Sequence, residues 1–206
     1  MSKEHILFKF VKNNKVVEHI DQLVNAIPNL SVKIEMPRNT KLGYMKYDVV
    51  NNFFIISINN NLSPSKFLYV FLHEYAHLLV AQKYKNAKPH GYEWQIEFFK
   101  LLKEAIQKEL FHISIAQTIL KEFFYAGVYS KQRDFAISIA IDKADHTKQP
   151  LYIKDLKIGT IFTTKNGMQF QLLEKKRTRY LCNEIKTNKK YLISSYAIID
   201  KIIKEN

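Results

Sequence analysis

The chain has 206 residues, a hydrophobic content of 47%, a single cysteine and a formal net charge of +13. That length suits one compact domain or a domain with a small appendage, and the apolar content excludes disorder as the main state. One cysteine excludes an intramolecular disulfide framework and an all-cysteine zinc ribbon. The charge favours a polyanionic partner, nucleic acid first and a membrane surface second, unless it reflects a lysine-rich proteome.

The first third of the chain predicts a helix followed by three strands. Apolar residues recur at helical spacing over residues 16–26, and Pro28 ends that helix. Alternation of apolar and polar side chains predicts strands at residues 30–36, 42–48 and 53–59. A turn at residues 50–52 joins the last two, so we expect a hairpin packed on helices.

The middle of the chain predicts four helices. Ser63 can cap free N–H groups, and Pro64 at the first helical position has no donor to leave unpaired. The segment that follows, residues 65–84, is apolar on nearly every face, which predicts a buried helix. Helical periodicity resumes after a polar break and predicts further helices at residues 91–110, 115–125 and 134–141.

Beyond a polar stretch that ends at Pro150, the pattern becomes strand-like. Asn166-Gly167 is a strong two-residue hairpin signal, and strands are expected at residues 160–164, 168–173, 179–184, 191–195 and 197–202. We therefore predict one domain over residues 1–150 and a small basic β-domain over 151–206. The second domain has 12 Lys/Arg and 5 Asp/Glu, a net charge of +7.

The chemical centre of the sequence is the run from His73 to His77, which follows the pattern H-E-x-x-H. On a helix, residues four apart lie one turn above each other, so His73 and His77 can bind one metal ion. Glu74 lies about 100° further round the helix and can reach a water bound to that metal as a general base. The pattern is short and occurs by chance. Here, however, these polar residues interrupt an apolar helix, where burial without partners is costly, so we predict metal binding.

A catalytic zinc needs a third protein ligand and an open position. Val80 and Lys83 occupy the places of the metzincin glycine and third histidine, which excludes that arrangement. His90 is the nearest remaining histidine, and the polar break before it lets the chain turn back; Glu93 and Glu97 are rival ligands. The remaining histidines are poorer candidates, namely His5, His19, His112 and His146.

With His90 included, the residues resemble the SprT-like zinc metalloproteases. The pattern of that family is H-E-x-x-H, a short connector and H-G-x-x-aromatic, and residues 90–94 read HGYEW. Upstream, residues 38–44 look like the family's arginine-to-Leu-Gly strand start, and residues 54–59 look like its strand before the metal helix. The resemblance covers residues 1–112 well and the remainder more loosely.

The resemblance implies an α+β fold, a minimal zincin with a small sheet beside metal-bearing helices. It implies one Zn²⁺ per chain, held by His73, His77 and His90, with Glu74 as the catalytic base, and action on DNA-associated proteins. Many members carry a C-terminal zinc ribbon with four cysteines. In this chain, Cys182 corresponds to the first of them, and the other three are missing. We therefore expect a metal-free, barrel-like β-domain, as in shorter bacterial members.

A basic stretch in the second domain predicts non-specific contact with DNA or RNA. Cations suit phosphate contacts, and Tyr180 and Tyr191 are placed for base stacking. The predicted contact residues are Lys175, Lys176, Arg177, Arg179, Lys189 and Lys190. The alternative is a solvated strand edge that lysines protect from aggregation.

Together these features predict a zinc metallopeptidase that acts on protein substrates near nucleic acid. A strand of the hairpin over residues 42–57 would align the substrate by strand addition, and Tyr44, Tyr47 and Tyr92 are candidate oxyanion stabilisers. The alternative function is a non-catalytic, zinc-stabilised module that binds nucleic acid or a polymerase. No signal peptide is expected, because the start of the sequence leads into no apolar stretch with a cleavage site. No membrane span is expected either, because His73, Glu74 and His77 interrupt the most apolar run. We therefore expect a cytoplasmic protein.

Overall fold

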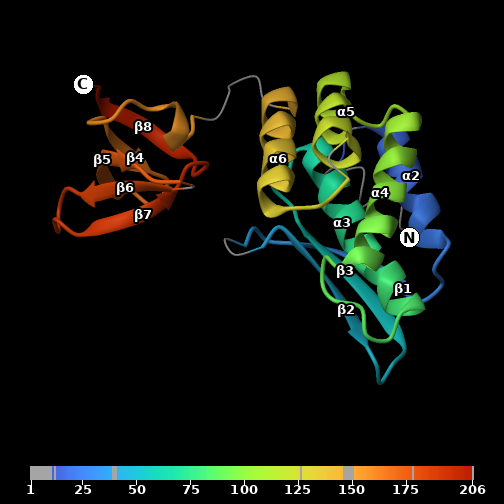
Figure 1. The fold of residues 1–206 in the computed structure, drawn as a ribbon. Helices are drawn as coiled ribbons and strands as arrows, with labels where there is room; N and C mark the ends of the chain where they lie inside the picture. The colour runs from blue at the N-terminus through green and yellow to red at the C-terminus, as the bar shows by residue number, and fades with distance from the viewer. Residues whose placement is uncertain are drawn as a thin grey trace. The chain divides into compact units, whose positions relative to one another are not determined.

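The computed structural model describes residues 11, 13–38, 41–125, 127–145, 151–177 and 179–205. The chain divides into two compact units, residues 1–147 and 148–206, which we call the site unit and the tail unit (Figure 1). The domain boundary predicted at residue 150 lies outside the described residues. No helix in the described ranges is long and apolar enough to cross a membrane.

A mixed three-stranded sheet forms one layer of the site unit. β3 (Phe53–Asn59) is the central strand, parallel to β1 (Leu30–Glu35) and antiparallel to β2 (Gly43–Asp48). The side chains of β3 are largely buried, as a central strand requires. β2 is an edge strand, so one row of its backbone groups is unpaired within the sheet. The predicted hairpin of β2 and β3 is confirmed.

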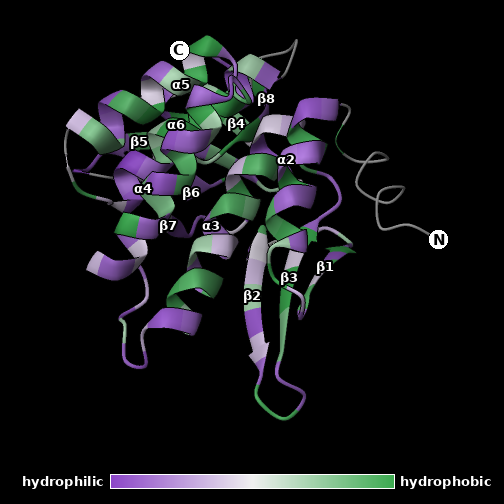
Figure 2. Ribbon diagram, turned by 90° about the vertical axis from the view of Figure 1, so that its right-hand side faces the viewer, coloured by the Kyte–Doolittle hydropathy of each residue, from purple (hydrophilic) through white to green (hydrophobic). Residues whose placement is uncertain are grey.

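Among the described residues, six helical segments complete the site unit. They are α2 (Asn14–Asn25), α3 (Pro64–Lys83), α4 (Tyr92–Gln107), α5 (Ile113–Ile119), a π-helical segment (Leu120–Tyr125) and α6 (Lys131–Asp145). Of these, α2 and α3 pack against the sheet. α3 contacts β2, β3, α4 and α6, which explains why it is apolar on nearly every face. α2 buries only one face, and Figure 2 accordingly shows both hydrophilic and hydrophobic segments along it.

Pro64 begins α3 as predicted, but Ser63 does not cap it through its side chain. A carboxylate from α6 takes that role instead. The backbone N–H of Ser65 donates to Asp145 Oδ2 at 2.9 Å, and the Ser65 hydroxyl donates to Asp145 Oδ1 at 2.7 Å. The first turn of α3 is therefore capped from a residue 80 positions away along the chain.

The tail unit is a five-stranded antiparallel sheet in the order β7-β6-β5-β4-β8. Its strands are β4 (Ile161–Thr164), β5 (Gln169–Lys175), β6 (Arg179–Glu184), β7 (Lys190–Ser194) and β8 (Ile199–Lys204). Closure would require β7 and β8 to pair, and across the described residues they lie at opposite edges. The predicted barrel-like form is therefore wrong.

A segment that we call the strap, residues 151–156, covers the apolar face of the sheet instead. Leu151, Ile153 and Leu156 pack against the tail core, and Tyr152 forms a β-bridge with Ile198.

The hairpin of β4 and β5 has a longer loop than its Asn-Gly signal predicts. Thr164 N–H donates to the Met168 carbonyl at 2.9 Å, which leaves residues 165–167 in the loop. Gly167 alone has a positive φ there, +83°. A two-residue turn of the Asn-Gly type needs positive φ at both positions, so glycine here serves a three-residue loop.

Candidate metal centre

Three histidines of the site unit meet at one point. His73 and His77 lie on α3, and His90 directly precedes Gly91, the N-cap of α4. His90 Nε2 is 3.0 Å from His73 Nε2 and 3.2 Å from His77 Nε2. A tetrahedral zinc with Zn–N bonds of about 2.0–2.1 Å sets its ligand nitrogens about 3.3–3.4 Å apart. The two distances from His90 Nε2 are therefore close to that value, and the ligand atoms of all three histidines lie within 4.8 Å of one another.

Hydrogen bonding among the imidazoles does not account for this arrangement. An imidazole nitrogen either donates one hydrogen bond or accepts one, whereas His90 Nε2 faces two other nitrogens. Burial lowers the pKa of His73 to about 3 and that of His77 to about 4, with neighbouring imidazoles adding to the effect. Burial also lowers the pKa of His90. All three rings are thus neutral at pH 7, the form that binds a metal.

A turn of the backbone brings His90 to the other two histidines. His90 has a φ of +57°, in the left-handed region that non-glycine residues seldom adopt. Its conformation is held by neighbouring hydrogen bonds: Gly91 N–H donates to the Lys88 carbonyl at 2.8 Å, and Gln95 Nε2 donates to the His90 carbonyl at 3.0 Å. The strained residue is thus fixed at the point where α4 begins.

Trp94, on the first turn of α4, supports all three rings. Its ring centroid lies 4.7 Å from that of His73, 5.3 Å from that of His77 and 4.6 Å from that of His90. The indole is fully buried, and it is the only tryptophan of the chain. Packing of this kind limits the rotation of the imidazoles and holds them in one arrangement.

Glu74 lies beside this cluster, on the part of α3 that faces the start of β2. The side chain is 9% exposed, and burial raises its pKa to about 7. A hydrogen bond from the Met45 backbone N–H and the charges of Lys41 and Arg38 act in the opposite direction. Glu74 and His73 line the same pocket, of about 240 Å³. The carboxylate is therefore held between the metal helix and the edge strand β2.

The rival ligands lie elsewhere. Among the described residues, the group able to hold a metal contains neither Glu93 nor Glu97. Glu97 is buried and its Oε1 pairs with Lys83 Nζ at 2.8 Å. His19 is buried on α2, His112 accepts a hydrogen bond as the N-cap of α5, and two other histidines, His5 and His146, lie outside the described residues.

The three candidate oxyanion tyrosines have other surroundings. Tyr44 donates to Glu35 at 3.3 Å, Tyr47 donates to Asn52 at 2.9 Å near the hairpin turn, and Tyr92 is 76% exposed. A residue that the sequence did not single out, Tyr129, stacks on the His90 ring at 5.3 Å between centroids. It comes from the loop before α6, far from the motif, and no local pattern marks it.

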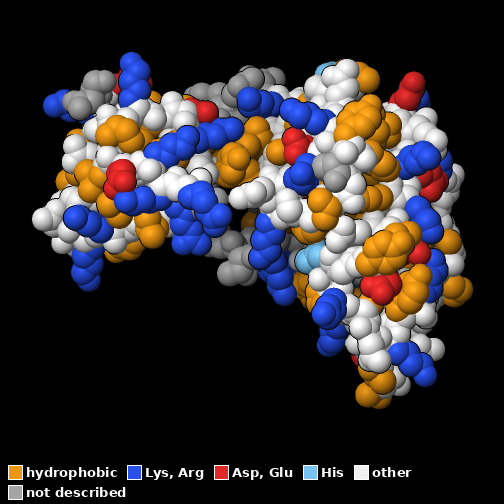
Figure 3. Space-filling view, viewed as in Figure 1, with side chains coloured by type: hydrophobic (Ala, Val, Ile, Leu, Met, Phe, Trp, Pro, Cys, Tyr) orange, Lys and Arg blue, Asp and Glu red, His pale blue; other side chains and the backbone are white. Residues whose placement is uncertain are grey.

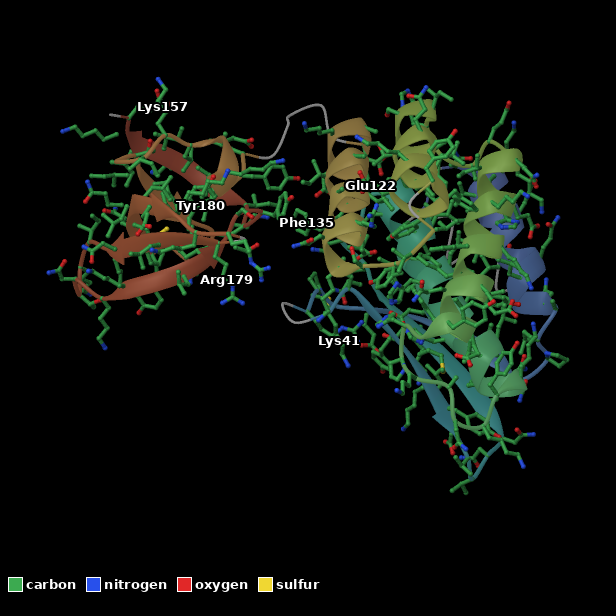
Figure 4. The ribbon with its side chains drawn as sticks, viewed as in Figure 1. Lys41, Glu122, Phe135, Lys157, Arg179 and Tyr180 are labelled. Carbon is green, nitrogen blue, oxygen red and sulfur yellow. The ribbon has the colours of Figure 1, made fainter. Side chains whose placement is uncertain are left out.

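The predicted nucleic-acid residues are all exposed on the tail unit, and Figure 3 shows Lys and Arg side chains spread over its visible face. They do not share one face of the sheet. Arg179 pairs with Ser194 and lies on the face opposite Tyr180, whereas Lys175 pairs with Tyr180 itself. Tyr180 is 5% exposed and belongs to the tail core, so its predicted stacking role is wrong (Figure 4). Tyr191 remains exposed.

Comparisons with protein-family models, with curated proteins and with solved structures find no match. The chain's own residues therefore carry the functional argument. They define a three-histidine group that can bind a metal ion.

Proposed function

We propose that the protein is a zinc-dependent endopeptidase of SprT-like type that acts on proteins near nucleic acid. The observation that carries this proposal is the cluster of three neutral imidazoles beside a buried carboxylate, in which His90 Nε2 lies 3.0 Å from His73 Nε2 and 3.2 Å from His77 Nε2. His73, His77 and His90 serve as the ligands, and Glu74 serves as the general base.

Glu74 is suited to move a proton at this site. A bound zinc ion would polarise the scissile carbonyl and lower the pKa of a water molecule to about 7. Glu74 accepts the proton of the attacking water and transfers it to the departing amine. Burial supports this role, because it raises the pKa of Glu74 to about 7, while positive charge close by lowers it and favours the carboxylate.

The edge strand β2 suits the alignment of an extended substrate. Its backbone reaches Glu74 through the N–H of Met45, so a peptide added beside β2 would run past the carboxylate. Backbone hydrogen bonds of this kind do not depend on side chains. They would favour unfolded or flexible segments of protein, because these can adopt a strand.

The tail unit supports contact with nucleic acid. Lys175, Lys176 and Arg177 are exposed at the turn between β5 and β6, although Lys176 Nζ also pairs with Glu174 at 2.7 Å. Exposed cations without a fixed partner bind phosphates through counterion release, without sequence preference. Such contact would hold the peptidase close to proteins bound on DNA or RNA.

Replacement of Glu74 by glutamine tests the proposal. Glutamine keeps the shape and removes the basic carboxylate, so cleavage of a flexible DNA-bound protein should fall by about 10²- to 10⁴-fold while zinc affinity is retained. Glu18→Gln, at an exposed position on α2, is the matched control and should cleave at the wild-type rate.

Two results would contradict the proposal. Cleavage by Glu74→Gln at the wild-type rate would remove Glu74 from the mechanism. Absence of cleavage by the zinc-loaded wild type, with or without DNA, would favour the alternative, a non-catalytic zinc-stabilised module that binds nucleic acid or a polymerase.

A further inference from the structure

A pocket of about 240 Å³ leads from the candidate metal centre along α3. Its α3 residues recur at helical spacing and so lie on one face of the helix: Lys66, Tyr69, Val70, His73 and Glu74. The pocket is lined on one side by residues at the start of β2 and on another by residues of α6. From His73 to Lys66 it spans about 10 Å at 1.5 Å per residue, the length of a long side chain.

The walls of this pocket are partly apolar. Leu42 contributes from the start of β2, and Val70 and the ring of Tyr69 contribute from α3. These groups suit the methylene stem of an extended side chain, whose charged end would then meet the polar groups of α6.

Lys66 is buried, and its ammonium is already fully engaged. Its Nζ contacts the Ser138 carbonyl at 3.4 Å, the Ser138 hydroxyl, and Asp142 Oδ1 at 3.5 Å. An ammonium has three donors, and these contacts use all of them. Asp142 also balances its charge, so Lys66 offers little to an incoming carboxylate.

Asp134 is the contrasting group. Its Oδ1 accepts a hydrogen bond from the Tyr69 hydroxyl at 2.6 Å. Within the described part of the chain, no Lys or Arg forms an ion pair with Asp134. Burial raises the pKa of Asp134, which the Tyr69 hydrogen bond and the charge of Lys66 oppose. The pocket therefore contains a desolvated carboxylate without a direct cationic partner.

Lys41 also lines the pocket, and its ammonium contacts an aromatic ring. Its Nζ lies 4.2 Å from the centroid of the Tyr44 ring, a cation–π contact. Glu74 adds a second carboxylate to the lining. The charged groups that remain for a substrate side chain are thus the carboxylates of Asp134 and Glu74.

We infer that this pocket receives the side chain of the substrate residue next to the scissile bond, and that Asp134 makes it select lysine or arginine. This specificity rests on the proposed peptidase function. The apolar walls bind the stem, and the Asp134 carboxylate accepts the hydrogen bonds of the cationic end.

The test uses the full-length, zinc-loaded chain and four matched peptides that differ only at the residue flanking the cleaved bond: lysine, arginine, norleucine and glutamate. Norleucine keeps the stem and removes the charge. The kcat/KM for lysine or arginine should exceed that for norleucine by about 10- to 100-fold, the factor that a hydrogen bond to a charged group supplies. Asp134→Asn retains an acceptor for Tyr69, and it should abolish this ratio. Asp145→Asn changes a carboxylate of α6 outside the pocket, and it should keep the ratio.

A second measurement separates this inference from the peptidase function. Binding of the same peptides to Glu74→Gln protein should show the preference for a cationic residue, and Glu74→Gln/Asp134→Asn should lose it. Cleavage without preference for a cationic residue overturns the inference and leaves the peptidase function intact. Preferential binding without any cleavage by the wild type overturns the peptidase function and supports the cation-selective pocket. Neither cleavage nor preferential binding overturns both.

Discussion

Replacing Gly43 by alanine should damage the site where β2 crosses α3. A Cβ at this position would lie 2.7 Å from Val70 Cγ1, 3.0 Å from the Ser57 carbonyl oxygen and 3.2 Å from Glu74 Cγ. The carbonyl belongs to the central strand β3, and a valine in a helix has essentially one allowed rotamer. Neither neighbour can move far, so the edge strand itself must shift.

The cost follows from these contacts. Overpacking of a closely packed site destabilises by about 1–3 kcal/mol. For a chain of this size each kcal/mol lowers the unfolding midpoint by about 2–4 °C, so a fall of about 2–12 °C is expected in Gly43→Ala. Glu74 is the most flexible of the three neighbours and would be displaced, so peptide cleavage should fall while zinc affinity changes little.

Thermal unfolding followed by circular dichroism, with zinc titration and peptide cleavage on the same protein, checks this expectation. Val70→Ala removes the nearest contact, so the double variant Gly43→Ala/Val70→Ala should be more stable than the sum of the two single effects predicts. An unchanged midpoint and unchanged cleavage in Gly43→Ala would refute the reasoning. Strictly additive effects would show that Val70 is not the obstacle.

Three further predictions concern metal, acid and salt. His90→Ala should weaken zinc affinity, measured by Trp94 fluorescence, by more than about 10- to 100-fold, which is what the loss of an outer-shell partner costs. Unchanged zinc affinity would point to a carboxylate as the third ligand. Burial and the charge of Lys108 lower the pKa of His19, so its contribution to stability is complete above about pH 6.5 and declines as the pH falls. His19→Leu should flatten the fall of the unfolding midpoint between pH 7 and pH 5, and an identical slope would contradict this. Replacing Arg177 and Arg179 together by alanine should weaken DNA binding and lower the salt slope by about one unit per lost contact, whereas an unchanged slope would leave these residues outside the interface.

The parts of the site that local spacing defines could be predicted from the sequence. His73 and His77 are one helical turn apart, and the apolar pattern around them fixes the helix. The connector to His90 is short, so the third histidine could be found as a candidate, although spacing alone did not separate it from Glu93 or Glu97.

Groups that tertiary packing brings in could not be predicted. Tyr129 and Asp134 lie about forty residues or more beyond His90, in a loop and a helix that carry no motif. Tyr180 is a residue whose sequence neighbours were misleading. Its place beside arginines suggests an exposed ring, whereas the alternation of side chains along β6 puts it in the core. Which face of a strand is buried depends on what covers the sheet. Here one face is covered by the strap over residues 151–156.

The cap that Asp145 places on α3 has a consequence for biosynthesis. α3 and all three histidines leave the ribosome well before residue 145 does, because the chain is made from its N-terminus. Until then the first turn of α3 lacks the acceptor that Ser65 contacts in the finished protein. A chain cut before Asp145 would retain all three histidines and still have an uncapped α3, so the histidine group alone does not define the smallest fully stabilised fragment.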